Sequence, residues 1–277
     1  MRIRGGRAGG ASSIGTAFFF QFPLDVGSIP ILITNFHVVK ISTDLGFRIR
    51  SRNADGSPNH QDQIHFNLPY GEANWVRHPY PAIDLAALPV GGLLEEATRK
   101  GKPPFFSSLM ETELPSAAQL LELSAVETIL MVGYPNGLWD EFNNLPITRA
   151  GITAAHPAIN YGGRTEYVID AACFAGSSGS PVFLHNTGSC LPRAGSTVMG
   201  GFRMQFLGVL YAGPVFSANG EIRVVDVPTQ LKPIPISQIP MNLGFVIKAA
   251  RILEFGPLLY RLSGLTRPLN TSAPLLP

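Results

Sequence analysis

Three side chains with complementary chemistry occur in the order histidine, aspartate, serine, at His37, Asp84 and Ser178. A serine hydroxyl becomes a nucleophile when a nearby histidine takes its proton and a carboxylate fixes the tautomer of the imidazole ring. The three residues are far apart in the sequence, so they can meet only in a folded structure. Their types and order predict a site for nucleophilic hydrolysis.

The serine lies in a glycine-rich stretch. Residues 174–183 read FAGSSGSPVF, in which Gly176 and Gly179 bracket Ser177 and Ser178. A backbone this rich in glycine turns tightly and can direct its N–H groups at one point, where they would hold an oxyanion. Gly/Ser turns are common between strands, so this stretch indicates a catalytic serine only in combination with His37 and Asp84 upstream.

The composition indicates a globular protein with one large domain or two small ones. Of its 277 residues, 45% are hydrophobic and 14% are charged, which is enough apolar material for a buried core. The 29 glycines and 24 prolines are scattered, as in an all-β protein with many turns. The net charge of +2 is too small to indicate a nucleic-acid partner.

Several other classes of protein and site are not favoured. The chain shows neither a secretory signal nor an apolar run of about 18 to 20 residues, so we expect a cytoplasmic protein with no membrane partner. No dinucleotide or phosphate-binding motif is present, and no cofactor is expected. His60, His65 and His78 lie on separate segments without other ligands at metal-binding spacing, so no metal site is predicted.

Short apolar runs separated by turn residues predict strands along most of the chain. The expected strands are 15–22, 31–41, 46–52, 64–68, 84–90, 126–133, 147–155, 166–169, 180–184, 204–211 and 243–247. Residues 93–100 are expected to form a short helix or turn, and residues 249–255 a helix. Residues 1–14 read as a flexible basic tail, about 96–121 as a linker between two β halves, and 256–277 as a Pro/Leu tail.

Six segments resemble, in order, the motifs of trypsin-like serine proteases. These are TNFHVV, DLAAL, VGYPNG, GSSGSP, LGVLYAG and NLGFVIKA, and the resemblance runs from Gly15 to Phe255. It is nearest to the bacterial, disulfide-free type, around the high-temperature-requirement proteases and the glutamyl endopeptidases. It implies an all-β fold of two six-stranded antiparallel barrels, at about 15–95 and 122–248, with a short C-terminal helix and an active site between the barrels.

The resemblance also implies the role of each site residue. Ser178 would be the nucleophile, His37 the general acid/base and Asp84 the orienting carboxylate, with the N–H groups of Gly176 and Ser178 forming the oxyanion hole. The primary specificity pocket would involve four uncharged residues, which predicts an apolar residue before the cleaved bond. These residues are Ala172, Cys173, Gly213 and Gly244. Asp170 would take part in this pocket only if the alignment with the family motifs were shifted by two residues.

One departure from the family concerns activation. Trypsin-like zymogens carry an aspartate where this chain has Ser177, so activation through an ion pair with a cut N-terminus is not expected. The resulting hypothesis is an endopeptidase that acts on protein or peptide substrates and is either constitutively formed or controlled by loop ordering. The alternative is a protease-fold effector or binding protein, silent until a partner protein triggers it.

Three further features are left open by the sequence. A bridge between Cys173 and Cys190 is compatible with their number and spacing. The Pro-rich segment 214–241 is an insertion that serves either as a lid or subsite wall or as a plain surface loop. The sequence indicates no oligomeric state.

Overall fold

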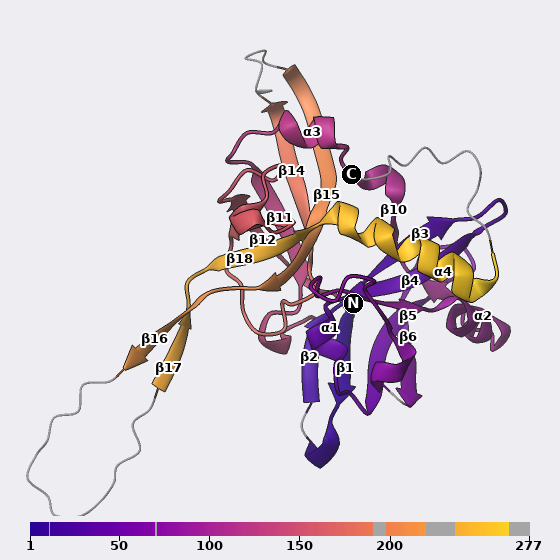
Figure 1. The fold of residues 1–277 in the computed structure, drawn as a ribbon. Helices are drawn as coiled ribbons and strands as arrows, with labels where there is room; N and C mark the ends of the chain where they lie inside the picture. The colour runs from indigo at the N-terminus through magenta and orange to yellow at the C-terminus, as the bar shows by residue number, and fades with distance from the viewer. Residues whose placement is uncertain (11, 70, 191–197, 220–235, 266–277) are drawn as a thin grey trace, which may run out of the picture.

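A computed structural model describes residues 1–10, 12–69, 71–190, 198–219 and 236–265, which fold into two β halves (Figure 1). Within the described residues, no helix is both long and apolar enough to cross a membrane. The two halves meet along strands β3 and β4 of the first half and the C-terminal helices, which share one apolar core with the second half.

The N-terminal half contains two five-stranded sheets. The first runs β2 (Ser12–Thr16), β1 (Arg2–Gly6), β5 (Asp44–Arg52) and β6 (Pro58–Pro69), with β9 (Pro104–Phe105) also paired to β5. The second runs β10 (Ser108–Met110), β3 (Phe18–Pro23), β4 (Ser28–Thr34), β8 (Ala86–Pro89) and β7 (Val76–Arg77). The two sheets contribute alternate apolar side chains, such as Ile3, Phe47 and Leu32, to one core.

The N-terminal half does not form the closed six-stranded barrel that was expected at about 15–95, because its strands lie in two separate sheets. The chain passes from β2 directly to β3 through Ala17, but hydrogen-bonded pairing does not continue from one sheet to the other. Residues 2–6 and 12–16 are not a flexible tail, because β1 pairs with β2 and β5. The predicted linker also takes part in this half, since β9 and β10 add strands to its two sheets.

The C-terminal half is a closed barrel of six strands. Its order is β11 (Thr128–Gly133), β12 (Ile147–Thr153), β13 (Glu166–Asp170), β18 (Leu243–Lys248), β15 (Val198–Ala212) and β14 (Pro181–Cys190). Every second side chain of these strands faces the interior, where Ile129, Ile169 and Val246 are buried.

The predicted insertion 214–241 leaves the barrel as a two-stranded ribbon. Strands β16 (Val215–Asn219) and β17 (Ile236–Pro240) pair with each other and point away from both halves (Figure 1). Residues 220–235, the rest of the insertion, lie outside the described residues.

The helices are short. They are α1 (Phe36–Val39), α2 (Gly91–Arg99), α3 (Ala117–Leu121) and α4 (Gly256–Ser263), and the 3-10 helices are η1 (Ala8–Gly10), η2 (Gly71–Asn74), η3 (Glu111–Glu113), η4 (Pro135–Gly137), η5 (Tyr161–Gly163) and η6 (Ala249–Phe255).

The strand expected over 31–41 ends at Thr34, and α1 follows it. The helix expected over 249–255 is the 3-10 helix η6. The α-helix α4 comes after it, inside the predicted tail, with Pro257 in the first turn where a missing N–H costs little.

Helices η6 and α4 join the two halves. They extend from the end of β18 across the N-terminal half (Figure 1). Ile252, Phe255 and Leu259 pack into the same core as Phe20 and Ile31. At about 25 cal/mol per Å² of buried apolar surface, each such side chain contributes on the order of 2 kcal/mol to this contact.

His78 fixes this contact with a polar interaction. Its side chain is fully buried, its Nδ1 accepts a hydrogen bond from the Tyr80 N–H (3.1 Å), and its Nε2 lies 3.0 Å from the Arg251 carbonyl and from a Glu254 carboxylate oxygen. Burial lowers the pKa of His78 below the ordinary value of a histidine, because the charged imidazole would lose its hydration. The accepting Nδ1 also requires the neutral ring, so Nε2 carries the proton and donates it to Arg251.

This burial predicts a pH-dependent stability. Because the pKa of His78 is lower in the folded state than in the unfolded state, the contribution of His78 is fully present above about pH 6.5 and is lost as the pH falls below it. Urea unfolding at several pH values should show a loss of about 1.4 kcal/mol per unit of pKa shift, reduced in His78→Gln. The exposed His65→Gln variant is the control; an equal reduction in both variants would contradict this assignment.

Candidate active site

His37 and Asp84 are brought together by neighbouring strands. Strands β4 and β8 are antiparallel, with Thr34 paired to Ala86. His37 in α1 follows the end of β4, and Asp84 precedes the start of β8, so both lie at the same edge of the sheet. The Asn35 side chain connects the two segments by donating a hydrogen bond to the Asp84 carbonyl (2.8 Å).

The contact between the two side chains sets the tautomer of the imidazole. His37 Nδ1 lies 2.5 Å from Asp84 Oδ2, and the His37 backbone N–H donates to Oδ1 (2.9 Å). An ionised carboxylate only accepts hydrogen bonds, so Nδ1 carries the proton and Nε2 keeps a free lone pair. The His37 side chain is 47% exposed and that of Asp84 26%, which leaves Nε2 free to act as a base toward a bound molecule.

Ser178 lies in the loop between β13 and β14, at the junction of the two halves. Its backbone carbonyl accepts a hydrogen bond from the Thr16 N–H (2.8 Å), and its Oγ donates to the Tyr211 carbonyl at 3.5 Å. Among the hydrogen bonds of the described residues, none joins Ser178 to His37. The structure thus pairs His37 with Asp84 and attaches the Ser178 loop to the N-terminal half.

Thr16 makes most of this attachment, and the sequence analysis did not single it out. Only 1% of its surface is exposed. Its Oγ1 donates to the Gly176 carbonyl (3.1 Å) and accepts from the Tyr134 N–H (3.2 Å) and the Ser180 hydroxyl (3.3 Å). Its carbonyl accepts from Thr34 Oγ1 (2.7 Å), at the end of the strand that leads to His37.

The two glycines of the loop are required by these close contacts. Gly179 has φ +86°, and a Cβ on it would lie 2.0 Å from the Thr16 carbonyl oxygen. Gly176 has φ +83°, and its Cβ would lie 2.6 Å from the Tyr134 carbonyl oxygen. Any larger residue would be both strained and in collision with backbone atoms.

The turn at η4 orients the peptide bond before Gly176. Asn136 and Gly137 have positive φ, as the predicted YPNG turn requires, and the Asn136 N–H donates to the Ala175 carbonyl (2.6 Å). In a trans peptide the N–H points opposite to the C=O, so the Gly176 N–H points away from this turn. Within the described residues, neither the Gly176 N–H nor the Ser178 N–H donates a hydrogen bond, which leaves both available to a ligand oxygen.

Three of the four predicted pocket residues lie close together. A Cβ on Gly244 would lie 2.7 Å from Cys173 Sγ, and one on Gly213 would lie 3.7 Å from Cys173 Cβ. Ala172 adjoins Cys173 in the same loop. Cys173 is a free thiol, and burial raises its pKa to about 11, so it stays protonated at neutral pH. The described side chains do not include that of Cys190.

Two charged residues near this pocket carry opposite signs. The Arg149 guanidinium lies over the Phe174 ring, 5.0 Å from its centre. Arg149 lowers the pKa of the Cys173 thiol and Asp170 raises it, although burial has the larger effect. Arg149 could not be placed here from the sequence, because it lies on β12, outside the family motifs.

Tyr211 lies in the LGVLYAG motif, but the sequence analysis assigned it no role at the site. Its carbonyl accepts the Ser178 hydrogen bond, and its own hydroxyl donates to Glu166 Oε2 at 2.5 Å. The buried Glu166 also pairs with Arg164 (2.6 Å). Burial and the neighbouring carboxylate raise the pKa of Tyr211, so the hydroxyl keeps its proton and holds this strand in place.

Two of the three histidines considered as metal ligands contact other protein groups. His60 Nδ1 lies 3.3 Å from an Arg50 nitrogen, and the His78 ring is occupied by the hydrogen bonds described above. Across the described ranges, no cluster of three or more potential metal ligands occurs.

A protein-family model covers the part of the chain that holds these residues. The model of the trypsin-like peptidase domain matches residues 15–191, a range that includes His37, Asp84 and Ser178. The chain is therefore a member of the trypsin-like peptidase domain family, and the resemblance seen in the sequence motifs is confirmed.

Among the solved structures to which this chain is similar, three are proteases by name. The thermostable serine protease AL20 from an extremophilic microorganism is 14% identical, with a TM-score of 0.48 over 93% of this chain and 94% of its own. Two inactive forms of the Rv3671c protease from M. tuberculosis H37Rv, one a mutant, are 16% and 18% identical, with TM-scores of 0.39 and 0.40. They cover 97% and 92% of this chain, and 88% and 87% of their own. A search of curated proteins gives no match.

The contacts of Thr16 predict that its hydroxyl supports the whole site. Thr16→Val should lower the free energy of unfolding by about 1 to 3 kcal/mol, because several buried partners lose their hydrogen bonds. Urea denaturation measures this loss. Thr16→Ser retains the hydroxyl and is the matched control; equal stability of the two variants would show that packing, not hydrogen bonding, holds this contact.

Proposed function

We propose that the chain is a serine endopeptidase that hydrolyses peptide bonds through Ser178, His37 and Asp84. The observation that carries this proposal is the His37–Asp84 pair, at the same junction to which Thr16 attaches the Ser178 loop. Membership of the trypsin-like peptidase family supports the proteolytic activity, and a protein or peptide is the substrate class that follows from it.

The reaction would begin with a rotation of the Ser178 hydroxyl. At 3.5 Å its hydrogen bond to the Tyr211 carbonyl is weak, so turning Oγ toward His37 costs little. As Oγ bonds to the substrate carbonyl carbon, its proton moves to Nε2 of His37, and Asp84 stabilises the resulting imidazolium.

The oxyanion formed in this step needs two donors. The free N–H groups of Gly176 and Ser178 are the candidates, and Asn136 keeps the first of them pointing away from the η4 turn. Loss of one such donor typically costs about 2.7 to 4 kcal/mol of transition-state stabilisation. His37 then gives its proton to the leaving amine, and water hydrolyses the acyl-enzyme with His37 as the base.

We further propose that no N-terminal ion pair activates this enzyme. Ser177 is 1% exposed and uncharged, and its hydroxyl has no hydrogen-bond partner within the described residues. A cationic N-terminus would therefore find no carboxylate at this position. The N-terminal half, although its two sheets remain open, would correspond to the first six-stranded barrel of related proteases.

Covalent labelling tests the nucleophile. A fluorophosphonate probe should label the unsubstituted chain and Ser177→Ala, but not Ser178→Ala. Asp84→Asn should label about 10⁴-fold more slowly, because the wrong imidazole tautomer would face the serine. Equal labelling of Ser178→Ala would remove Ser178 from its role; complete inertness of the unsubstituted chain would favour the silent, partner-triggered alternative.

The pocket predicts the preferred residue before the cleaved bond. Peptides with Ala, Val or Leu at this position should be cleaved about tenfold or more faster than those with Arg, Lys or Glu, because Cys173, Gly213 and Gly244 offer no counter-ion. Competition between matched peptides measures the ratio of kcat/KM. A preference for Arg or Lys would instead implicate Asp170, and a preference for Glu would implicate Arg149.

A further inference from the structure

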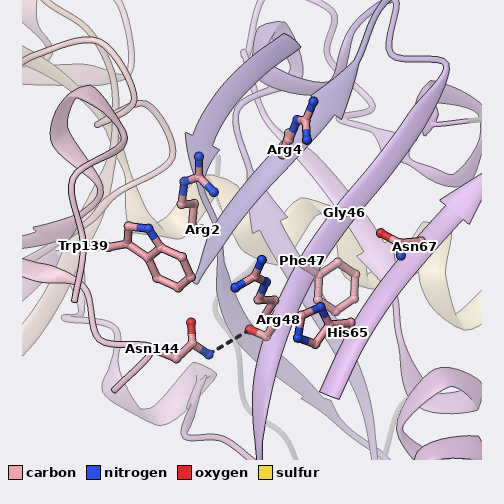
Figure 2. A pocket seen from close by; sticks show the side chains of 9 residues that line it. All are labelled: Arg2, Arg4, Gly46, Phe47, Arg48, His65, Asn67, Trp139 and Asn144. Atoms are coloured by element: carbon pink, nitrogen blue, oxygen red, sulfur yellow. Dashed lines mark hydrogen bonds between the residues drawn. The ribbon is translucent and has the colours of Figure 1, made fainter. Parts of the chain in front are cut away.

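A basic pocket lies on the outer face of the first sheet, and its lining includes none of the residues proposed for catalysis (Figure 2). It occupies about 160 Å³ between strands β1, β5 and β6 and the segment that follows η4. Its lining includes Arg2, Arg4, Arg48, His65, Asn67 and Trp139.

The strand register places these side chains on one face. Arg2 and Arg4 are two residues apart on β1, and Arg48 lies opposite His65 in the pairing of β5 with β6. Successive side chains of a strand alternate between faces, so the intervening Ile3 points into the core. Gly46 carries no side chain and leaves the space between Arg4 and Asn67 open.

The positive charges of this pocket are not balanced. Arg48 lies 3.5 Å from Glu141, but both side chains are exposed, so this pair is weak. Within the described part of the chain, neither Arg2 nor Arg4 has an ion-pair partner. The Arg2 Nε is buried and has no hydrogen-bond acceptor in the same part of the chain, so a buried donor points at no protein atom that could accept from it.

Trp139 holds two of these cations in place. The guanidinium groups of Arg2 and Arg48 each lie 5.5 Å from the centre of its ring. The Asn144 side chain also donates to the Arg48 carbonyl (3.3 Å), which ties the segment after η4 to β5 (Figure 2). The guanidinium forks are therefore arranged before any ligand arrives, which lowers the entropic cost of binding.

We propose that this pocket binds a small oxyanion with two or more negative charges, such as phosphate or a phosphoryl group. Drug-sized ligands occupy pockets of about 300 to 1,000 Å³, so a cavity of about 160 Å³ suits a smaller group. Arginine guanidinium groups bind such oxyanions by paired, charge-assisted hydrogen bonds, and the side chains of His65 and Asn67 add further polar groups.

The same pocket adjoins the turn that orients Gly176. A Cβ on Gly137 would lie 3.9 Å from an Arg2 nitrogen, and the Gly137 N–H donates to the Tyr134 carbonyl (2.9 Å). Asn136, in the same turn, holds the Ala175 carbonyl. An anion that fixes Arg2 and Trp139 would therefore stabilise the turn on which the Gly176 N–H depends. This second step rests on the proposed function, whereas the binding step does not.

Binding is tested with inorganic phosphate on the full chain. The protein has two tryptophans, so Trp75→Phe leaves Trp139 as the only tryptophan, whose emission can be excited separately from that of the tyrosines. Its emission should change and saturate as phosphate is added, with sodium chloride at matched ionic strength as the blank. Calorimetry on the unsubstituted chain repeats the measurement without relying on this variant. No saturable signal in either assay would overturn the proposal.

Variants identify the pocket. Arg2→Gln and Arg48→Gln should each weaken phosphate binding about tenfold or more, as expected for the loss of a charge-assisted hydrogen bond. The exposed Arg99→Gln on α2 is the matched control and should bind normally. Equal weakening in all three variants would show general charge attraction and overturn the site. Tighter binding of O-phosphoserine than of phosphate would indicate a phosphoryl group as the source; the reverse would indicate the free ion.

Coupling to the active site is tested separately. Saturating phosphate should raise the fluorophosphonate labelling rate of the unsubstituted chain several-fold, with no change in Arg2→Gln. Binding without any change in rate would overturn the coupling. If no condition gives labelling, the proposed function fails, while calorimetry still decides whether the anion binds.

Discussion

The five hydrogen bonds of Thr16 are the constraint on which the rest of the site depends. Through its N–H, hydroxyl and carbonyl, one buried residue contacts the Ser178 loop, the Tyr134 turn and the strand that leads to His37. In the proposed reaction the two halves would contribute different groups, so their relative position would have to be fixed to a fraction of an ångström. Packing alone positions side chains less precisely than this set of directional contacts between backbone and hydroxyl groups.

The N-terminal half can support this site without closing into a barrel. Asp84 and His37 meet because β4 and β8 are adjacent and antiparallel, which is a property of one sheet edge. Its two sheets need only enclose their core and present that edge to the barrel. The barrel half, in contrast, carries a loop whose glycines contact backbone atoms on two sides, and its closed set of strands gives this loop a rigid base.

The sequence predicted those parts whose residue types are dictated by chemistry or by backbone conformation. The contact between His37 and Asp84, the YPNG turn and the glycines of the Ser178 loop all belong to this class. Thr16, Trp139 and Tyr211 could not be found in the same way, because a threonine, tryptophan or tyrosine in a β protein is usually only a packing residue. The N-terminal arginines and glycines resembled a flexible tail because pairing with β5, a distant segment, is invisible to local propensity. The helix at 256–263 was missed because residues 256–277 were interpreted as one Pro/Leu tail, whereas Pro257 lies in the first turn of the helix, where proline is tolerated.

The core shared by β3, β4 and the C-terminal helices has a consequence for how the molecule as a whole behaves. Ile252 and Phe255 bury Phe20 and Ile31, which become exposed to water if the C-terminal helices detach. Unfolding of either half would therefore expose apolar side chains of the other half. The chain is therefore one cooperative unit in spite of its two-part architecture. Cutting the segment between the halves would leave both fragments associated, and exchanging one half for that of a relative would require the matching C-terminal helices to be exchanged with it.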